Sequence, residues 1–290
     1  MSLSHDPALR TYRTDTYPTI SPTLAHLSTA GKSALVTGAG AGGIGAAITA
    51  SLARSGISTL GLLGRNESRL RQTKQRVQAI SPTTSVHIYI ADLTDYHAVQ
   101  TALSTFAAAV PGGTIDVLIA NAGYMSELSS VAAAEVGEWW KSFEINVLGN
   151  MHLVQAFLPF ATPATAKEDD KGAAIVHISS SVVHGPYLPE YSAYRAAKAG
   201  ATKMFEYIAA ENPQHFVLQV HPGFILTSAM AADRFLDKAE QYGLQGDSGQ
   251  SSNFRFLPFS AHAWHRFLCC CNFFGERGRF ELKLLMNWSY

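Results

Sequence analysis

Short apolar runs alternate with stretches of helical periodicity along most of this chain. The apolar runs predict six strands, over residues 33–37, 58–63, 86–90, 115–120, 173–179 and 216–220. Apolar positions recurring with helical spacing predict helices over 44–55, 67–80, 96–110, 134–160 and 191–211. Because the strands are almost entirely apolar, we expect them to be parallel and buried on both faces. The alternation therefore predicts an α/β fold, a single doubly wound parallel sheet with helices on both faces.

The two ends of the chain follow a different pattern. Residues 1–31 are polar and turn-rich, which indicates an N-terminal extension that packs on the domain. We place the domain itself at residues 32–235. The remaining segment, 236–290, is atypical: it is rich in Gly, Gln and Ser over 239–253 and lacks a clear period afterwards. Residues 278–286 could form one last strand, and whether this segment is the incomplete end of the same domain stays open.

Composition narrows the class of protein. Hydrophobic residues make up 47% of the chain and charged residues 15%, with a formal net charge of +0, which argues against a nucleic-acid partner. No run of about 18 apolar residues predicts a membrane span. The three cysteines, Cys269 to Cys271, are adjacent and form neither a disulfide framework nor a metal-binding spacing. We therefore expect a cytoplasmic protein without a metal site.

A glycine-rich turn follows the first predicted strand and opens the first predicted helix. It contains Gly38, Gly43, Ile44 and Gly45. Glycine permits both a tight turn and a close approach of the backbone to a diphosphate, and the helix N-terminus offers free N–H groups to an anion. Strand, glycine turn and helix in this order predict a Rossmann-type dinucleotide site.

The end of the second predicted strand carries a cation where an acidic residue is common. NAD-preferring sites place Asp or Glu here to bind the ribose 2′-hydroxyl, whereas an arginine suits a 2′-phosphate. This chain has Arg65. The residue favours NADP(H) over NAD(H), although an arginine that only faces solvent would look the same in the sequence.

Tyr194 and Lys198 are four residues apart on one predicted helix, so they share a face. An ammonium beside a phenol favours the phenolate and lowers the pKa of the tyrosine, which allows proton exchange with a carbonyl or alcohol oxygen. A serine run, 179–181, ends the fifth predicted strand at the sheet edge where ligands of such folds bind. Counting from the strand favours Ser180 as the hydroxyl that faces the substrate, and counting back from Tyr194 favours Ser181. We choose Ser180.

Together these motifs resemble the short-chain dehydrogenase/reductase family over roughly residues 31–230, and loosely its members from filamentous fungi. The glycine turn matches the motif TGxxxGxG with one extra residue, and the Tyr–Lys pair matches YxxxK. Further elements match in the expected order: Asp92 in Ala-Asp-Leu, Asn121 in Ala-Asn-Ala-Gly, Asn146 in Ile-Asn-Val-Leu-Gly, and Pro222-Gly223 followed by Thr227.

The resemblance implies a role for each matching residue. Tyr194 would be the acid/base, Lys198 would lower its pKa and bind the nicotinamide ribose, and Ser180 would polarise the substrate carbonyl. Asn146 would hold a water that links Lys198 to solvent, and Thr227 would touch the nicotinamide amide. Asp92, Asn121, Pro222 and Gly223 would join the glycine turn in binding the cofactor. The resemblance also implies a homo-oligomer.

Two functions remain under consideration. The first is an NAD(P)-dependent oxidoreductase that transfers a hydride between nicotinamide and a ketone or secondary alcohol, with a role in secondary metabolism. The second is a non-catalytic dinucleotide-binding or regulatory protein whose pocket is impaired by the atypical end. His184 and Tyr187 follow the serine run and are candidates for the substrate pocket.

Overall fold

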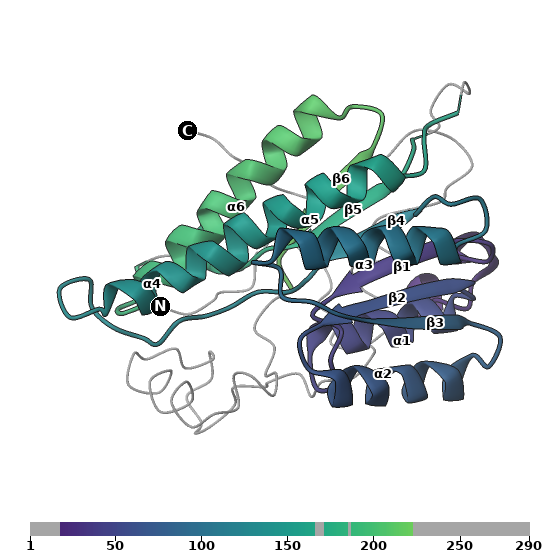
Figure 1. The fold of residues 1–290 in the computed structure, drawn as a ribbon, viewed down its shortest axis with the longest axis horizontal. Coiled ribbons are helices and arrows are strands. Elements are labelled where there is room, and N and C mark those ends of the chain that lie inside the picture. The colour runs from purple at the N-terminus through teal and green to yellow at the C-terminus, as the bar shows by residue number, and fades with distance from the viewer. Residues whose placement is uncertain (1–17, 166–170, 185–186, 223–290) are drawn as a thin grey trace.

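The computed structural model describes residues 18–165, 171–184 and 187–222 (Figure 1). Their strands form one parallel sheet in the order β3-β2-β1-β4-β5-β6. The strands are β1 (Ser33–Thr37), β2 (Thr59–Gly64), β3 (Ser85–Ile90), β4 (Val117–Ala120), β5 (Ala174–Ile178) and β6 (Phe216–Val220). The predicted doubly wound, Rossmann-type sheet is therefore confirmed.

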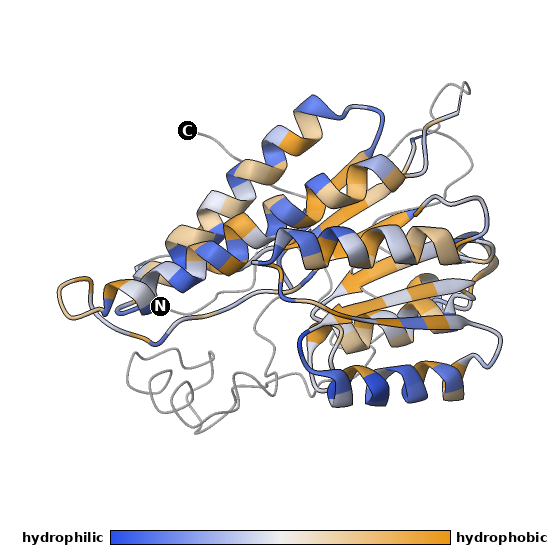
Figure 2. Ribbon diagram, viewed as in Figure 1, coloured by the Kyte–Doolittle hydropathy of each residue, from blue (hydrophilic) through white to orange (hydrophobic). Residues whose placement is uncertain are grey.

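Helices cover both faces of the sheet. On one face lie α1 (Ile44–Arg54) and α2 (Glu67–Ile80). On the other lie α3 (Tyr96–Ala109), α5 (Gly149–Phe157) and α6 (Ser192–Glu211), and α4 (Val136–Phe143) leads into α5. Successive strand residues point to opposite faces, so Leu35 belongs to the core under α3 and α5, whereas Ala34 and Val36 belong to the core under α1. The strands are hydrophobic along their length, and α2 turns a hydrophilic side outward (Figure 2).

The strand order reverses between β1 and β4. From β1 the chain continues outward to β2 and β3, then crosses back to pair β4 with the other side of β1. In sheets of this kind ligands bind at the reversal, beyond the carboxyl ends of the strands. The ends of β1, β2 and β4 are thus the place to look for a site.

The structure differs from the sequence prediction most clearly in the long helix over 134–160. It begins at Val136 and contains a π-helical turn, η3 (Glu144–Leu148), where Gly149 N–H bonds the Glu144 carbonyl five residues back. A short 3-10 turn that contains Pro159, η4 (Leu158–Phe160), ends it. Apolar periodicity alone does not reveal a π-turn, because the insertion shifts the register by one residue without changing the composition.

Smaller differences lie at the strand and chain ends. Ile115, predicted as the start of the fourth strand, makes an isolated bridge to Ala161 instead. Residues 18–31 of the extension contain two 3-10 turns, η1 (Pro18–Ile20) and η2 (Ala25–Leu27), and Thr29 bonds Ser55 at the end of α1. The last strand proposed for 278–286 lies outside the described residues. Within those residues, none of the helices has the length and apolar character needed to cross a membrane.

Candidate active site

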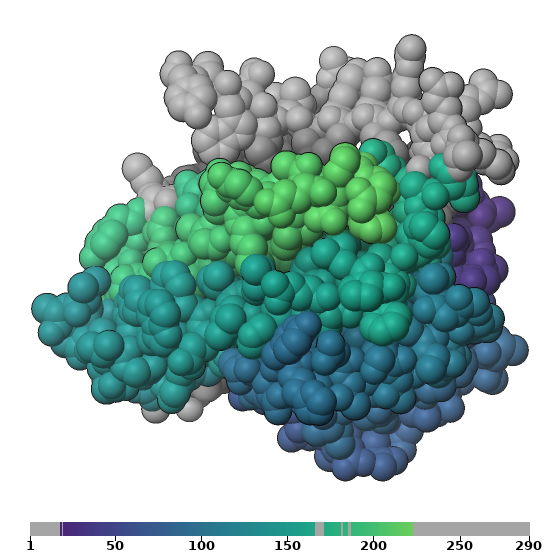
Figure 3. All heavy atoms as spheres, turned by 45° about the horizontal axis from the view of Figure 1, so that its top comes forward, coloured from purple at the N-terminus to yellow at the C-terminus, as the bar shows by residue number. Residues whose placement is uncertain are grey.

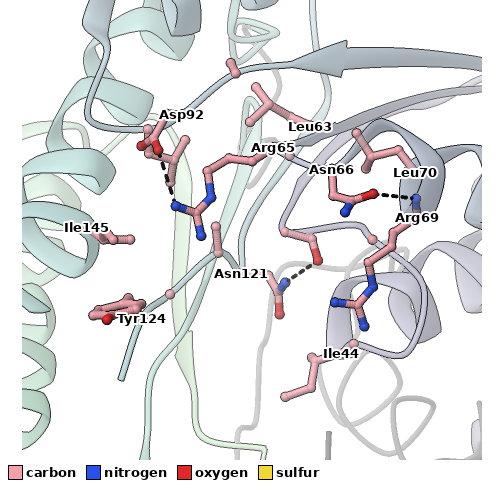
Figure 4. Close-up of a pocket in the computed structure, with 18 of the residues that line it drawn as sticks. Ile44, Leu63, Arg65, Asn66, Arg69, Leu70, Asp92, Asn121, Tyr124 and Ile145 are labelled. Atoms are coloured by element: carbon pink, nitrogen blue, oxygen red, sulfur yellow. Dashed lines mark hydrogen bonds and ion pairs between the residues drawn. The ribbon is translucent and has the colours of Figure 1, made fainter. Parts of the chain in front are cut away.

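A cleft of about 360 Å³ opens at the carboxyl ends of β1, β2 and β4, where the strand order reverses (Figure 4). Its wall combines the glycine-rich turn, the loop after β2, the loop after β3 and the loop after β4. The predicted cofactor residues that line it are Gly38, Gly43, Ile44, Arg65, Asp92 and Asn121. The fold therefore brings these sequence-distant residues to one place.

The glycine-rich turn leaves no room for side chains on its inner side. Gly38 has φ +62°, and a Cβ there would lie 2.9 Å from Asn121 Nδ2. A Cβ on Gly45 would lie 2.5 Å from the Gly38 carbonyl oxygen. The N-terminus of α1 follows at Gly43, and no side chain of the described residues caps it. A backbone cradle with free helix N–H groups fits the diphosphate of a dinucleotide. The extra residue of the motif is absorbed at Gly42, with φ +78°.

Asn121 joins the two halves of the sheet at the reversal. Its side-chain amide donates to the Thr37 carbonyl at 2.8 Å, and its backbone N–H donates to the Thr37 hydroxyl at 3.0 Å. The Thr37 hydroxyl also accepts from Ala122 N–H and donates to the Ile119 carbonyl. The end of β4 is thereby fixed against the glycine turn, so Asn121 braces the cleft as well as lining it.

Arg65 and Asp92 meet across the upper part of the cleft (Figure 4). Arg65 Nη1 lies 3.5 Å from Asp92 Oδ2, and the side chains are 67% and 39% exposed. Asp92 also accepts from the backbone N–H and hydroxyl of Thr94. Burial acts to raise the pKa of Asp92, but the Thr94 hydrogen bonds and the Arg65 charge hold it below its usual value. Two residues predicted to bind the cofactor separately therefore form one exposed ion pair.

Sequence reasoning missed a second arginine in the cleft. Arg69 lies in the first turn of α2, and its side chain extends beside Ile44 (Figure 4). Asn66 caps the helix by accepting from Arg69 N–H at 3.0 Å, and the Arg69 carbonyl accepts from Ala41 N–H in the glycine turn. The signal was present in the sequence: Arg69 is four residues after Arg65 and three residues after Asn66, a residue type that favours helix N-caps.

Lys198 is buried below the far end of the site. Its Nζ donates to the Ile178 carbonyl at the end of β5, at 2.9 Å, and only 4% of the residue is exposed. Burial lowers the pKa of Lys198 to about 8, because removing an ammonium from water disfavours its charged form. The ammonium is therefore still mostly charged at neutral pH but is easily titrated.

Tyr194 lies one turn before Lys198 on α6 and shares a hydrogen bond with Ser180. Lys198 Nζ lies 5.9 Å from the centre of the Tyr194 ring. Burial raises the pKa of Tyr194, and the bond to Ser180 acts in the opposite direction. The pKa of Tyr194 is therefore raised in this structure, whereas a lowering was expected: the effect of burial outweighs that of the hydrogen bond to Ser180.

Asn146 sits in the π-turn with no exposed surface. Its Nδ2 donates to the carbonyls of Tyr124 and Ser142 at 2.7 and 2.8 Å, and its Oδ1 accepts from Tyr124 N–H at 3.2 Å. A Cβ on Gly123 would lie 2.9 Å from Asn146 Oδ1 and 3.3 Å from Lys198 Nζ. Asn146 and Lys198 therefore converge on the loop after β4, and the Asn146 side chain is bonded to protein rather than open to solvent.

The remaining predicted residues lie at the edge of this arrangement or beyond it. Ser181 begins the 3-10 turn η5 (Ser181–Val183), whereas Ser180 reaches Tyr194. Pro222 is half-buried after β6, and Gly223 and Thr227 lie outside the described residues. His184 and Tyr187 are both exposed, Tyr187 at 83%. Tyr124, which sequence reasoning missed, lines the cleft beside Gly123 and donates its hydroxyl proton to Glu138.

The described residues contain no group of His, Cys, Asp or Glu side chains placed to hold a metal ion. The adjacent cysteines 269–271 lie outside the described residues. The groups that the described residues bring to this site are a phenol, a buried ammonium, a hydroxyl and a dinucleotide cradle.

Comparisons with known proteins agree with this geometry. The family model described as short chain dehydrogenase matches residues 32–238. The chain is 29% identical over 224 residues to the short chain dehydrogenase/reductase AacuD of Aspergillus aculeatus, covering 77% of this chain and 73% of that protein. It is 30% identical over 239 residues to the short chain dehydrogenase pigC of Monascus ruber, covering 80% and 74%.

Among solved structures, a short chain dehydrogenase from Burkholderia cenocepacia in complex with NADP superposes with a TM-score of 0.62. It shares 24% sequence identity, over 73% of this chain and 83% of that one, and so supports the fold. The site and fold define a nicotinamide-dinucleotide-dependent oxidoreductase of the α/β class. The chain belongs to the short-chain dehydrogenase/reductase family.

Proposed function

We propose that this protein is an NADP(H)-dependent dehydrogenase or reductase that acts on a ketone or secondary alcohol. The observation that carries the proposal is the hydrogen bond between Tyr194 and Ser180 beside the buried Lys198. A phenol, a hydroxyl and an ammonium within reach of one another are the groups that a carbonyl oxygen needs when it gains a proton.

Each residue has a distinct task in this proposal. The cofactor, when bound in the cleft, supplies or accepts the hydride. Ser180 and Tyr194 hydrogen-bond the substrate oxygen, and Tyr194 gives or takes its proton. Lys198 holds a positive charge near the phenol and turns towards the cofactor ribose. Asn146 keeps the loop after β4 in place against Lys198 through its bonds to Tyr124.

The pKa of Tyr194 bears on the direction of the reaction. Burial raises this pKa, so the phenol stays protonated at neutral pH. A protonated phenol is the form that donates to a carbonyl oxygen, and therefore the described state suits reduction. Oxidation needs the phenolate, which we expect to gain importance as the pH rises.

The preference for NADP(H) rests on the two arginines of the cleft. Arg65 and Arg69 bring guanidinium groups to the region after β2, where a 2′-phosphate would be recognised. We expect Arg65→Ala to weaken NADPH binding by roughly tenfold and NADH binding by less than twofold, since one charged hydrogen bond contributes about 1.5 kcal/mol. Fluorescence titration of both cofactors measures this. Arg71→Ala, on the outer side of α2 and paired with Glu67, is the matched control.

The central test joins cofactor binding to turnover. Purified protein is titrated with NADPH and NADH and then supplied with a panel of ketones and secondary alcohols. Tyr194→Phe should lower kcat by about 10³-fold with unchanged cofactor affinity, because it removes only the proton donor. Tyr207→Phe, on the same helix and 63% exposed, should change neither.

Two outcomes of that test are decisive. If neither cofactor binds at micromolar concentration, the proposed function is wrong. If NADPH binds, no substrate turns over and Tyr194→Phe changes nothing, the non-catalytic regulatory function replaces it.

The oligomeric state, the metabolic role and the cellular location of the enzyme are also part of the proposal. A homo-oligomer is supported by large apolar side chains that are exposed on α4, η3, α5 and α6: Trp140, Leu148, Met151 and Tyr207. The segments from α4 to α6 form part of one continuous surface of the molecule (Figure 3). A role in secondary metabolism in the cytoplasm is supported by the likeness to fungal relatives and by the cysteine pattern. Sedimentation measurements, and metabolite profiles of a deletion strain, test these two points.

A further inference from the structure

Asn150 is a buried polar residue that the proposed mechanism does not use. It lies on α5 with no exposed surface, one turn before the buried Leu153 and Val154. Its Nδ2 donates to the main-chain carbonyl of Asn146 at 2.7 Å. The carbonyl of the π-turn residue is thus engaged by a side chain of the same helix.

The orientation of the Asn150 amide follows from this bond. A carbonyl oxygen can only accept, so the nitrogen of the amide must face it and Oδ1 must face the other way. Within the described part of the chain, Oδ1 is buried and has no hydrogen-bond partner. A buried amide oxygen without a donor is unfavourable, which indicates that a donor belongs there.

Lys198 also has N–H groups for which the described residues show no acceptor. An ammonium carries three N–H groups, and the acceptor found for Lys198 among the described residues is the Ile178 carbonyl. Asn146, to which Asn150 is bonded, converges with Lys198 on Gly123. Asn146 therefore lies between Asn150, which bonds its carbonyl, and Gly123, the loop position that Lys198 also approaches.

We propose that Asn150 is a positioning residue for Lys198, its Nδ2 fixing the Asn146 carbonyl and its Oδ1 accepting, directly or through one buried water, from the Lys198 ammonium. The inference rests on the proposed function, because it assigns Asn150 to the proton chemistry of that site. In this arrangement the amide at 150 sets how strongly the ammonium is held, and Asn146 does not carry that task alone.

Other titratable groups also face Lys198. Tyr194 does so from α6 itself, and His177 does so from β5, where its ring stacks on Phe205 at 4.1 Å. Burial and the Lys198 charge lower the pKa of His177 to about 3, so this ring is neutral. Its Nδ1 bonds Gln219 Oε1, while its Nε2 is a second buried acceptor without a partner among the described residues. His177 is thus the alternative partner that an experiment must separate from Asn150.

An NMR titration tests the proposal without depending on activity. It follows the ionisation of Lys198 in the full chain through ¹³Cε-labelled lysines. The Lys198 signal is assigned by its loss in Lys198→Arg. Asn150→Asp should raise the pKa of Lys198, tightening proton binding at least about tenfold, because an opposite charge nearby favours the ammonium. Asn150→Ala should weaken proton binding a few-fold by removing the acceptor. Gln155→Glu, exposed on the same helix, should change nothing.

Each outcome decides the inference. If Asn150→Asp leaves the titration of Lys198 unchanged, Asn150 does not face Lys198, and His177 is the better candidate. Should Asn150→Asp not fold, the same conclusion follows from an unchanged titration in Asn150→Ala. If wild type turns over substrate, Asn150→Ala should lower kcat about tenfold with NADPH affinity within about threefold, since misplacing a supporting group affects the reaction more than binding. Absence of turnover in wild type would overturn the proposed function while the NMR result still judges Asn150.

Discussion

At one end of the site two opposite charges meet in solvent, and at the other a single charge is buried with no counter-ion among the described residues. Arg65 and Asp92 are 67% and 39% exposed, whereas Lys198 is 4% exposed and bonded to a carbonyl. An exposed ion pair contributes little to stability and is free to exchange partners, which suits recognition of a ligand. A buried ammonium is costly to the fold and has a shifted pKa, which suits proton chemistry.

The glycine-rich turn is the proposed cofactor cradle between these two ends. A substitution that fills it should therefore have the largest effect on the site. Gly45→Ala places a Cβ 2.5 Å from the Gly38 oxygen, so the turn must open or move away from Asn121. We expect at least a hundredfold loss of NADPH affinity and a loss of stability of about 2–3 kcal/mol, the usual cost of overpacking. Isothermal titration and urea unfolding measure the two effects.

Gly200→Ala is the matched control for this glycine substitution. A Cβ at Gly200 would meet Val147 Cγ2 at 3.5 Å, an ordinary contact, in the middle of α6. Because alanine favours the helix by up to about 1 kcal/mol, this variant should be neutral or more stable. Equal damage from both variants would show that the cradle is not the constraint.

The buried end can be tested through stability. The pKa of Lys198 is about 8 in the folded protein and 10.5 ordinarily, so the unfolded chain binds more protons between these pH values. The free energy of unfolding should therefore rise as the pH increases from about 8 to about 10.5, and the cost of the buried charge is fully present below pH 8. Lys198→Met should raise the free energy of unfolding at pH 7 by roughly 1–2 kcal/mol while abolishing turnover, some of the gain being lost to the unbonded Ile178 carbonyl.

Urea unfolding at pH 7 and pH 9.5 measures this gain, which should shrink at the higher pH. Lys203→Met, on the same helix, 68% exposed and paired with Glu206, should shift stability by less than about 0.5 kcal/mol at either pH. A destabilised Lys198→Met at both pH values would mean that the charge is better accommodated than its burial suggests.

Changes to the exposed Arg65–Asp92 pair should have the smallest effect on stability. Asp92→Asn removes the charge that faces Arg65, but at these exposures solvent screens the pair, so stability should fall by less than about 0.5 kcal/mol. Thermal unfolding at low and physiological salt tests this, and the effect should diminish as salt increases. A loss of several kcal/mol, independent of salt, would contradict the contrast between the two ends.

Much of the fold follows from patterns that the sequence displays openly. Apolar runs locate every strand within about two residues, because buried parallel strands must be apolar throughout. The glycines were predicted from the strand that they follow, Tyr194 and Lys198 from their helical spacing, and Asn121 from the resemblance to the family. Their convergence follows from the strand order alone.

The residues that escaped prediction depend on tertiary contacts. Apolar periodicity does not predict the π-turn. In the sequence Asn150 is one polar residue among apolar ones, and only the structure shows its bond to the Asn146 carbonyl. The raised pKa of Tyr194 likewise reflects burial that residue spacing cannot supply. Motifs thus indicated the candidate residues, and tertiary packing determines the burial and hydrogen bonds of their side chains.

The brace between Thr37 and Asn121 has a consequence for how the protein is made. These residues are 84 positions apart, and the segment between them holds three strands and three helices. A long-range contact of this kind forms only after a large loop has closed, which slows folding. During synthesis the glycine turn emerges early, yet it lacks its brace until β4 has inserted beside β1. The onset of cofactor binding would therefore report when the two halves of the nascent chain dock.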